Sequence, residues 1–233
     1  MILLMKLLCA IISVAILMKT LYANGYGVNV SNKRARRAFL SGILAVIVVV
    51  FCLAGIEAEK TFFNILWLSA FPEELIKMTI MLLLLQRYKY RSRIDILILF
   101  GCIGLGFAFA ENVFYSLSDK SLMNFIFARG LISTLGHFSY AIIMGYFVCQ
   151  ALHVAKTRSH KTMYYALAFA IPVLIHWMGN VNKMLLPIGS IGIFLELVKY
   201  IVMPVIVFRI IKRTRFESVD KMELIQSEQV SFR

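Results

Sequence analysis

The sequence predicts an all-α protein, a polytopic membrane helix bundle of about seven transmembrane helices, and three observations support this fold class. The chain of 233 residues is 61% hydrophobic with a mean hydropathy of +0.82, whereas soluble domains are about 45–50% apolar. Its apolar segments approach the ~20 residues that a helix needs to cross a bilayer. Lysine and arginine gather in alternate connections between these segments. We therefore expect a multi-pass protein of the cell membrane.

The basic residues form four short runs, and their alternation sets the expected orientation. The runs lie at 33–37, 87–93, 156–161 and 209–215, and the connections between them are nearly neutral. Because basic loops stay on the cytoplasmic side, we expect the N-terminus outside and the C-terminus in the cytoplasm. The same rule accounts for the net charge of +13, so the expected partner of these charges is the lipid bilayer and not a nucleic acid.

Polar and charged residues flank each apolar segment and so predict where each helix begins and ends. Residues 1–23 form a first transmembrane helix that could serve as a signal-anchor; a cleaved signal peptide is disfavoured because its charged start is weak. Residues 24–211 form the transmembrane core, and 212–233 form a polar cytoplasmic tail. Loops at 24–32, 57–60 and 118–121 and the basic runs divide the core into expected spans at 38–56, 63–86, 95–116, 125–151, 163–181 and 190–209.

The span at 63–86 contains the charged stretch Phe71-Pro-Glu-Glu-Leu-Ile-Lys77. Each charge inside a bilayer costs about 2.5–3.5 kcal/mol, so such residues are expected to pair or to perform chemistry. Lys77 lies four residues after Glu73 and three after Glu74, and on a helix it can reach either carboxylate. It cannot neutralise both, so one carboxylate is left in a dry site as a candidate general base.

The next two spans also carry polar residues. Glu111 is an isolated carboxylate in the span at 95–116. Arg129, Ser133 and His137 follow one another at four-residue steps, so they lie on one face of the span at 125–151. Each residue alone could be a packed and satisfied polar group, and Arg129 could extend towards the membrane surface.

His176 and Asn180 share a face of the span at 163–181, at positions i and i+4. The polar clusters of four successive spans reach overlapping depths in the outer half of the membrane. Because buried polar groups need partners in hydrocarbon, one shared polar cavity explains them together.

Together these motifs resemble the PrsW family of intramembrane proteases, which is related to the CAAX prenyl endopeptidases. The resemblance covers about residues 63–182 and uses four motifs in order: Glu73-Glu-Leu-Ile-Lys77, Phe107-Ala-Phe-Ala-Glu111-Asn, Arg129 to His137 followed by Met144-Gly-Tyr-Phe147, and His176-Trp-Met-Gly-Asn180. It implies hydrolysis of a peptide bond in a membrane-anchored, single-pass protein that resembles an anti-sigma factor, and makes residues 24–211 the protease core.

The resemblance and the intramembrane cluster suggest that water is activated by a carboxylate. The expected catalytic residues are Glu73, Glu74, Lys77, Glu111, His137, His176 and Asn180. A glutamic-type site that works without a metal is favoured. Zinc is the alternative cofactor, and its expected ligands are Glu111, His137 and His176.

Two readings from other classes fit the same residues. Intramembrane Glu, Lys and His also occur in proton relays, so a proton-coupled transporter is an alternative, although no internal repeat is seen. The other alternative is a non-enzymatic membrane protein that binds a partner and keeps the motifs for packing. The residues name neither the substrate nor the oligomeric state.

Overall fold

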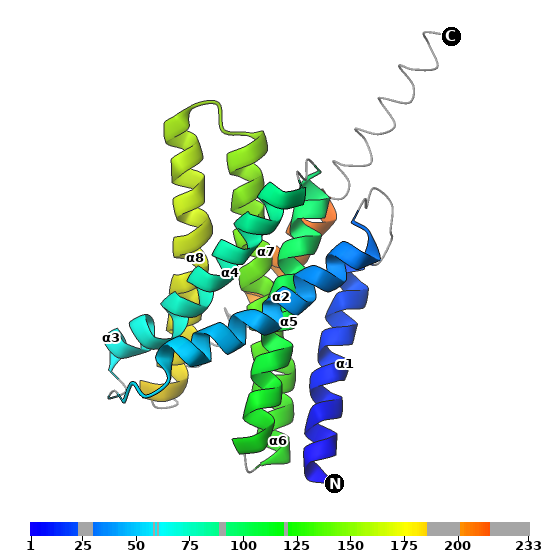
Figure 1. The fold of residues 1–233 in the computed structure, drawn as a ribbon, viewed down its shortest axis with the longest axis vertical. Coiled ribbons are helices and arrows are strands. Elements are labelled where there is room, and N and C mark those ends of the chain that lie inside the picture. The colour runs from blue at the N-terminus through cyan, green and yellow to red at the C-terminus, as the bar shows by residue number, and fades with distance from the viewer. Residues whose placement is uncertain are drawn as a thin grey trace.

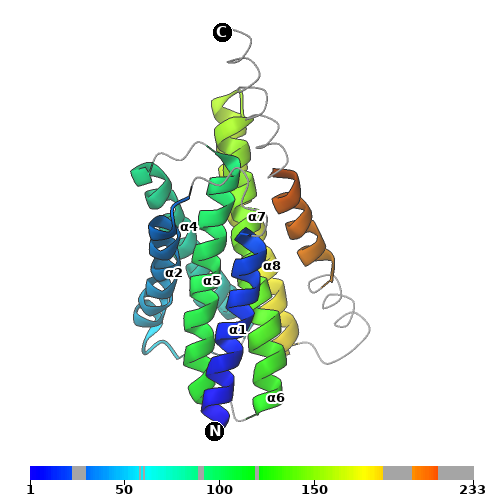
Figure 2. The same ribbon diagram turned by 90° about the vertical axis from the view of Figure 1, so that its right-hand side faces the viewer.

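A computed structural model shows a bundle in which most helices run along one axis, while the helices at 32–53 and 71–88 cross it obliquely (Figures 1 and 2). It describes residues 1–22, 30–57, 59, 61–88, 92–118, 121–185 and 201–214. All regular structure within these ranges is helical, which confirms the predicted all-α class.

Among the described residues, five helical stretches are long and apolar enough to cross a membrane: Ile2–Tyr22, Asn32–Leu53, Arg93–Ser118, Leu122–His153 and Arg158–Val181. They correspond to α1, α2, α5, the run from α6 to α7, and most of α8 (Arg158–Leu185). A multi-span membrane protein is therefore confirmed. The total of seven spans and the orientation in the membrane stay predictions.

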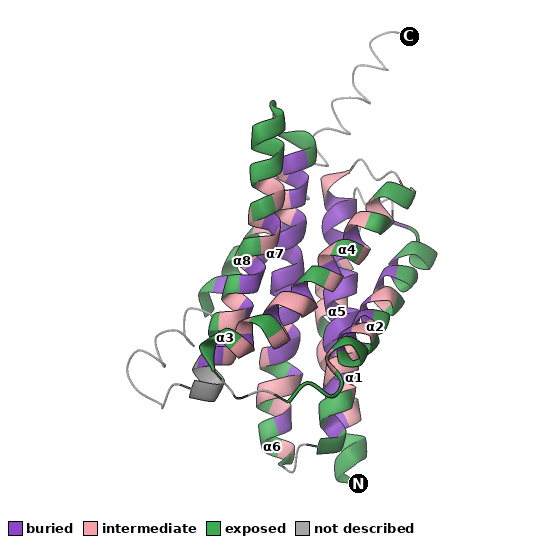
Figure 3. Ribbon diagram, turned by 60° about the vertical axis from the view of Figure 1, so that its left-hand side comes forward, coloured by how far each residue is buried: buried purple, intermediate pink, exposed green. Residues whose placement is uncertain are grey.

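Helix α5 (Arg93–Ser118) is the central element, and α1, α2 and α7 (Thr134–His153) pack around it. Every residue from Ile94 to Ala108 is buried, as the purple colouring of this helix in Figure 3 shows. Apart from Asp95 at its start, this run has no charged residue and is buried on every side, because neighbouring helices cover all of its faces.

Two glycines fix the crossing of α2 (Asn32–Leu53) over α5. A Cβ atom at Gly42 would lie 2.2 Å from the carbonyl oxygen of Ile103, and one at Gly106 would lie 2.0 Å from that of Phe39. The two backbones can touch only because both residues lack a side chain. Beyond this point α2 continues obliquely across the bundle (Figure 1).

Helix α2 begins at Asn32, six residues before the expected start of this span. The basic run 33–37 therefore forms its first turns and does not belong to a loop, because lysine, arginine and alanine are all good helix formers. Arg37 donates a hydrogen bond to Tyr88 Oη (3.1 Å), and the Arg34 guanidinium lies over the Tyr88 ring. The start of α2 is thus held against the end of α4.

The expected span at 63–86 is helical but broken. It consists of α3 (Phe62–Ile65), a π-helical turn η1 (Leu66–Ala70) and α4 (Phe71–Tyr88), and it is not among the five candidate spans. The N–H of Phe71 donates to the carbonyl of Leu66, which is a π-type bond. Pro72 follows; it has no N–H, and its ring crowds the carbonyl four residues earlier, so the helix widens before it.

A second π-helical stretch, η2 (Phe125–Ser133), follows the short α6 (Leu122–Asn124) and precedes α7. The N–H of Thr134 reaches back to the carbonyl of Arg129, and so does its hydroxyl at 3.1 Å. Asn112 of α5 donates to the same carbonyl at 3.1 Å and to the Thr134 hydroxyl at 2.8 Å. These bonds tie the widened turn to α5.

The last expected span, 190–209, falls largely outside the described residues. Residues 203–214 are helical and pack on α7, where the Phe138 and Phe208 rings lie 6.5 Å apart. This helix continues past 209 into the expected tail, and residues 215–233 lie outside the described part.

Candidate active site

Lys77 forms an ion pair with Glu74. Its Nζ lies 2.5 Å from Glu74 Oε1, and both side chains are fully buried. The same oxygen lies 2.8 Å from Nδ1 of His176, which reaches in from α8. Two donors from two helices therefore satisfy one oxygen of Glu74 and balance its charge.

Glu73 pairs with no lysine or arginine that the structure describes. Its Oε1 accepts a hydrogen bond from Ser69 at 3.2 Å, and the Ser69 hydroxyl accepts one from Asn180 Nδ2 at 3.0 Å. Its Oε2 is buried and makes no hydrogen bond with any residue that the structure describes. His176 Nε2 lies 3.8 Å from this oxygen. A buried carboxylate oxygen with no donor is positioned to accept one from a water molecule.

His137 links this pair to Glu111. Lys77 Nζ lies 3.2 Å from His137 Nδ1, and His137 Nε2 lies 3.0 Å from Glu111 Oε2. Because an ammonium group can only donate, Nδ1 accepts, and the neutral ring carries its proton on Nε2, which donates to Glu111. The tautomer is assigned from these contacts.

The predicted polar face of the fifth span converges on Glu111. Its Oε2 accepts a hydrogen bond from Ser133 at 3.0 Å and pairs with Arg129 Nη1 at 3.3 Å, in addition to the bond from His137. The Arg129 guanidinium stacks on the ring of Tyr115, with 3.3 Å between its central carbon and the ring centroid. Arg129 therefore neutralises Glu111 and does not extend away from the site.

Aromatic rings enclose the charged groups. The Lys77 ammonium lies 4.4 Å from the centroid of Phe107, which also packs on His137. The Tyr140 ring stacks on His176 at 5.0 Å, with 19° between the ring planes. These contacts orient both imidazoles and keep Lys77 away from lipid.

The structure brings six of the seven expected residues into direct contact with one another: Glu73, Glu74, Lys77, Glu111, His137 and His176. Asn180 joins them only through Ser69. Ser69 and Tyr140 were not singled out from the sequence. Helical spacing offered a signal for both, because Ser69 lies four residues before Glu73 and Tyr140 three after His137.

The charges of the site do not cancel. Among the described side chains, Lys77 offsets Glu74 and Arg129 offsets Glu111, whereas Glu73 has no cation of its own. A buried carboxylate without a cation of its own readily takes up a proton or a further cation. The unbalanced charge therefore makes Glu73 the candidate of this cluster for proton exchange or metal binding.

Glu73, His137 and His176 each offer one ligand atom, and these atoms lie within 4.8 Å of one another. This set differs from the expected zinc ligands by having Glu73 in place of Glu111. His176 fits metal binding, because Nδ1 bonds to Glu74 and leaves Nε2 turned towards Glu73. His137 fits less well, because Lys77 and Glu111 engage both of its nitrogens and one bond would have to be exchanged.

A cavity of about 380 Å³ leads to the carboxylates from the side of the bundle. It lies beyond the α2–α5 crossing, and its lining residues come from α2, α4 and α5: Val46, Val49, Val50, Glu73, Phe107, Glu111, Phe114, Tyr115 and Ser118. Its walls are mainly apolar and aromatic, and Glu73 and Glu111 supply its charge. Val50, Phe114 and Tyr115 are exposed on the outside of the bundle, so the cavity opens towards the lipid.

A multi-pass helical bundle that gathers carboxylates, imidazoles and a lysine around a side cavity has the architecture of an enzyme that works inside the membrane. The sequence model described as "PrsW family intramembrane metalloprotease" matches residues 30–210, and the chain belongs to this family. The resemblance inferred from the four motifs is thereby confirmed. The family description names a metalloprotease, whereas the residues alone led us to favour a metal-independent site.

Curated relatives agree with this assignment. The chain is 29% identical over 150 residues to Protease PrsW of Oceanobacillus iheyensis, a match that covers 62% of this chain and 67% of that protein. Protease PrsW of Shouchella clausii is 28% identical and that of Halalkalibacterium halodurans 29%, each over 145 residues. Both matches cover 60% of this chain and 65% of the relative. No solved structure matches the chain.

Proposed function

We propose that this protein hydrolyses a peptide bond of a membrane-anchored, single-pass protein, using a water molecule that Glu73 activates. The observation that carries the proposal is the Oε2 atom of Glu73, which is buried beside His176 and has no hydrogen-bond donor among the described residues. Glu74 also has a buried Oε2 without a donor among the described residues, but Lys77 and His176 hold its Oε1 and offset its charge, which makes it the weaker base of the two.

In the proposed reaction Glu73 Oε2 takes a proton from water while the water oxygen attacks the carbonyl carbon of the peptide. The protonated Glu73 then gives this proton to the peptide nitrogen, and the carbon–nitrogen bond breaks to release a carboxyl and an amine. A positioned general base of this kind contributes about 10²–10⁴-fold to the rate. His176, next to Glu73 and held by Glu74, orients the water.

The remaining residues keep this arrangement in place. Lys77 holds Glu74 ionised and fixes the tautomer of His137, and its charge favours negative charge developing on the substrate oxygen. Glu111 accepts a hydrogen bond from His137 Nε2 and so fixes the orientation of the ring. Asn180 acts through Ser69 on Glu73, so it is a positioning residue.

A divalent ion such as zinc would be held by Glu73, His137 and His176, and it would supply Lewis-acid polarisation and a more acidic bound water. Metal analysis of the purified protein, with cleavage measured after chelation, distinguishes the two chemistries. Full cleavage by metal-free protein assigns water activation to the carboxylate alone. Loss of cleavage that zinc restores assigns it to the ion.

The side cavity supports a route for the substrate. A peptide segment that arrives within the bilayer can enter beyond the α2–α5 crossing, pass Val50 and Phe114, and reach Glu73 without crossing the polar surface. A helical segment hides its carbonyl groups in its own hydrogen bonds. The segment must therefore unwind locally before its carbonyl carbon can be attacked.

We further propose that the cleavage site lies towards the outer side of the membrane. The starts of α2 and α5 and the α7–α8 connection carry the basic runs, and they lie at the same end of the bundle (Figure 1). Taking this end as cytoplasmic puts the N-terminus outside. Glu73 lies 15 residues before Tyr88 at the basic end, which is roughly 22 Å along α4. Because α4 crosses the bundle obliquely (Figure 1), the depth of Glu73 below this end is smaller and corresponds to the middle to outer part of a hydrocarbon core about 30 Å thick.

The test is cleavage of candidate single-pass membrane proteins by the purified, lipid-reconstituted protein. The inactive comparison carries Glu73→Gln and Glu111→Gln, and the matched control is Glu57→Gln, which changes an exposed glutamate in a loop. We expect wild type and the control to release the same two fragments and the double variant to release none. Equal cleavage by all three proteins would show that another centre or a contaminating protease does the chemistry.

A further inference from the structure

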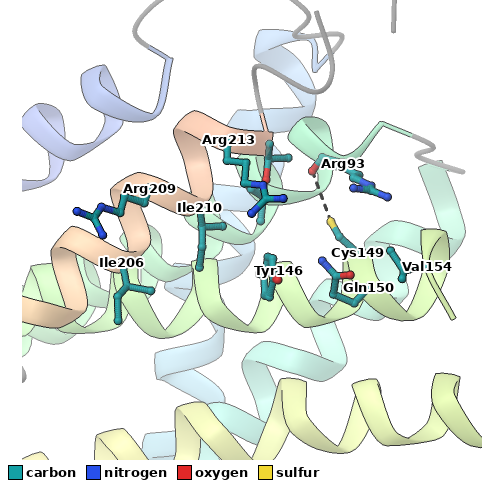
Figure 4. Close-up of a pocket in the computed structure, with 11 residues that line it drawn as sticks. Arg93, Tyr146, Cys149, Gln150, Val154, Ile206, Arg209, Ile210 and Arg213 are labelled. Carbon is teal, nitrogen blue, oxygen red and sulfur yellow. Dashed lines mark hydrogen bonds between the residues drawn. The ribbon is translucent and has the colours of Figure 1, made fainter. Parts of the chain in front are cut away.

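A second cavity lies at the other end of the bundle from the carboxylates. It has a volume of about 560 Å³ and lies between the start of α5, the end of α7 and the helix at 203–214 (Figure 4). Its lining residues are Arg93, Leu97, Tyr146, Cys149, Gln150, Val154, Ile206, Arg209, Ile210, Arg213 and Thr214. It shares no residue with the proposed active site, and the inference below does not depend on the proposed function.

The polar part of the lining suits an anion with phosphate chemistry. Arg93, Arg209 and Arg213 come from two chain segments, and Gln150 adds an amide from a third, α7. No carboxylate is present among the described lining residues. Arginine presents a planar fork of donors that matches phosphate oxygens in a bidentate manner.

The rest of the lining suits a ligand that also has an apolar part. Leu97 lies one turn into α5 from Arg93, and Ile206 lies nearly one turn before Arg209. Figure 4 shows the Tyr146 ring between Arg213 and the body of α7, with the Arg209 and Arg93 side chains on either side of Arg213. The cavity is therefore basic towards the end of the bundle and apolar towards its middle.

The cavity also lies at the right depth for a lipid head group. Arg93 is the first residue of α5 and Val154 follows the last residue of α7, and both helices belong to candidate membrane spans. The arginines are thus at the boundary of the hydrocarbon core. The volume falls within the roughly 300–1,000 Å³ of small-molecule sites.

We propose that this cavity binds the phosphate head group of an anionic phospholipid from the leaflet at the basic end, with the first acyl carbons against Leu97, Ile206 and Ile210. Basic pockets between transmembrane helices on the cytoplasmic side are suited to such lipids. Because the ligand would contact both α5 and the helix at 203–214, its binding would hold this last helix against the bundle.

The test uses the full chain in detergent with phosphatidylglycerol, phosphatidylcholine or inorganic phosphate added. The variant is Arg209→Gln with Arg213→Gln, two exposed positions of the helix at 203–214, and its unfolding temperature without lipid reports whether the fold is kept. The matched control is Lys33→Gln with Arg36→Gln, which removes two exposed charges at the same end of the bundle outside the cavity. Native mass spectrometry counts the retained lipids, and the unfolding temperature reports binding independently.

We expect wild type and control to retain phosphatidylglycerol in preference to phosphatidylcholine, and the arginine variant to bind it about tenfold more weakly or worse, since each hydrogen bond to a charged group contributes about 1.5–3 kcal/mol. Equal loss in the control would show a general surface-charge effect and overturn the proposal. Inorganic phosphate that binds as tightly as the lipid and displaces it would make the ligand a soluble anion, which also overturns it.

Discussion

Replacing Lys77 by methionine should cost both stability and cleavage. Lys77 is fully buried, lies 2.5 Å from Glu74, and donates to His137 across the site. Methionine keeps the volume but leaves the Glu74 charge buried with only His176 as a donor. Removing one partner of a buried ion pair costs about 3–5 kcal/mol. For a chain of this size that corresponds to a fall in unfolding temperature of about 6–20 °C.

The measurement is thermal unfolding in detergent, with cleavage assayed below the transition. Lys161→Met is the control, because it changes an exposed lysine at the start of α8 and should leave the unfolding temperature unchanged. The double variant Glu74→Gln with Lys77→Met removes both charges and should regain part of the lost stability without regaining cleavage. An unfolding temperature of Lys77→Met equal to that of wild type would refute the buried pair.

Three further variants test other parts of the structure. Ser69→Ala removes the one hydrogen-bond donor to Glu73 among the described residues and should lower kcat about tenfold with KM unchanged. A shift in KM alone would contradict a positioning role. Val50→Trp fills the side cavity and should lower kcat/KM, measured from initial cleavage rates, at least tenfold. Ile47→Trp changes an exposed residue of the same helix outside the cavity and should leave kcat/KM unchanged. Equal effects of the two changes would argue against substrate entry through this cavity. Gly106→Ala places a Cβ 2.0 Å from a carbonyl of α2 and should cost about 1–3 kcal/mol in denaturant unfolding, so an unchanged midpoint would contradict the close α2–α5 contact.

Hydropathy and charge were sufficient to predict the helical membrane class and the position of most helices. The reason is that a bilayer requires long apolar helices, whose length and flanking charges are visible in composition. The broken third span could not be predicted in this way. Pro72 was visible as a disruption, but the π-helical turn before it depends on how the chain relaxes around a missing N–H.

Residue types and spacing also predicted which side chains meet, but not how they pair. Lys77 can reach Glu73 or Glu74 equally well by helical spacing. Lys77 pairs with Glu74 because of tertiary contacts. His176 on α8 hydrogen-bonds to Glu74, and His137 on α7 accepts a hydrogen bond from Lys77. Such contacts between distant segments leave no periodic signal in one sequence.

The two π-helical turns, which the sequence did not predict, both contribute to the site. Ser69 lies in η1 and Ser133 lies in η2, and each donates to a carboxylate of the centre, Glu73 and Glu111 respectively. Both widened turns thus place a hydroxyl beside an acid. Widened turns of this type are frequent at functional sites.

The measurement that bears most directly on the account is the cleavage rate of Glu73→Gln, taken on protein whose unfolding temperature is measured in parallel. We predict that cleavage falls by about 10²–10⁴-fold while the unfolding temperature stays near that of wild type, because among the described residues Glu73 pairs with no lysine or arginine and approaches only His176 Nε2, at 3.8 Å. A Glu73→Gln protein that cleaves at the wild-type rate would contradict the assignment of water activation to this carboxylate.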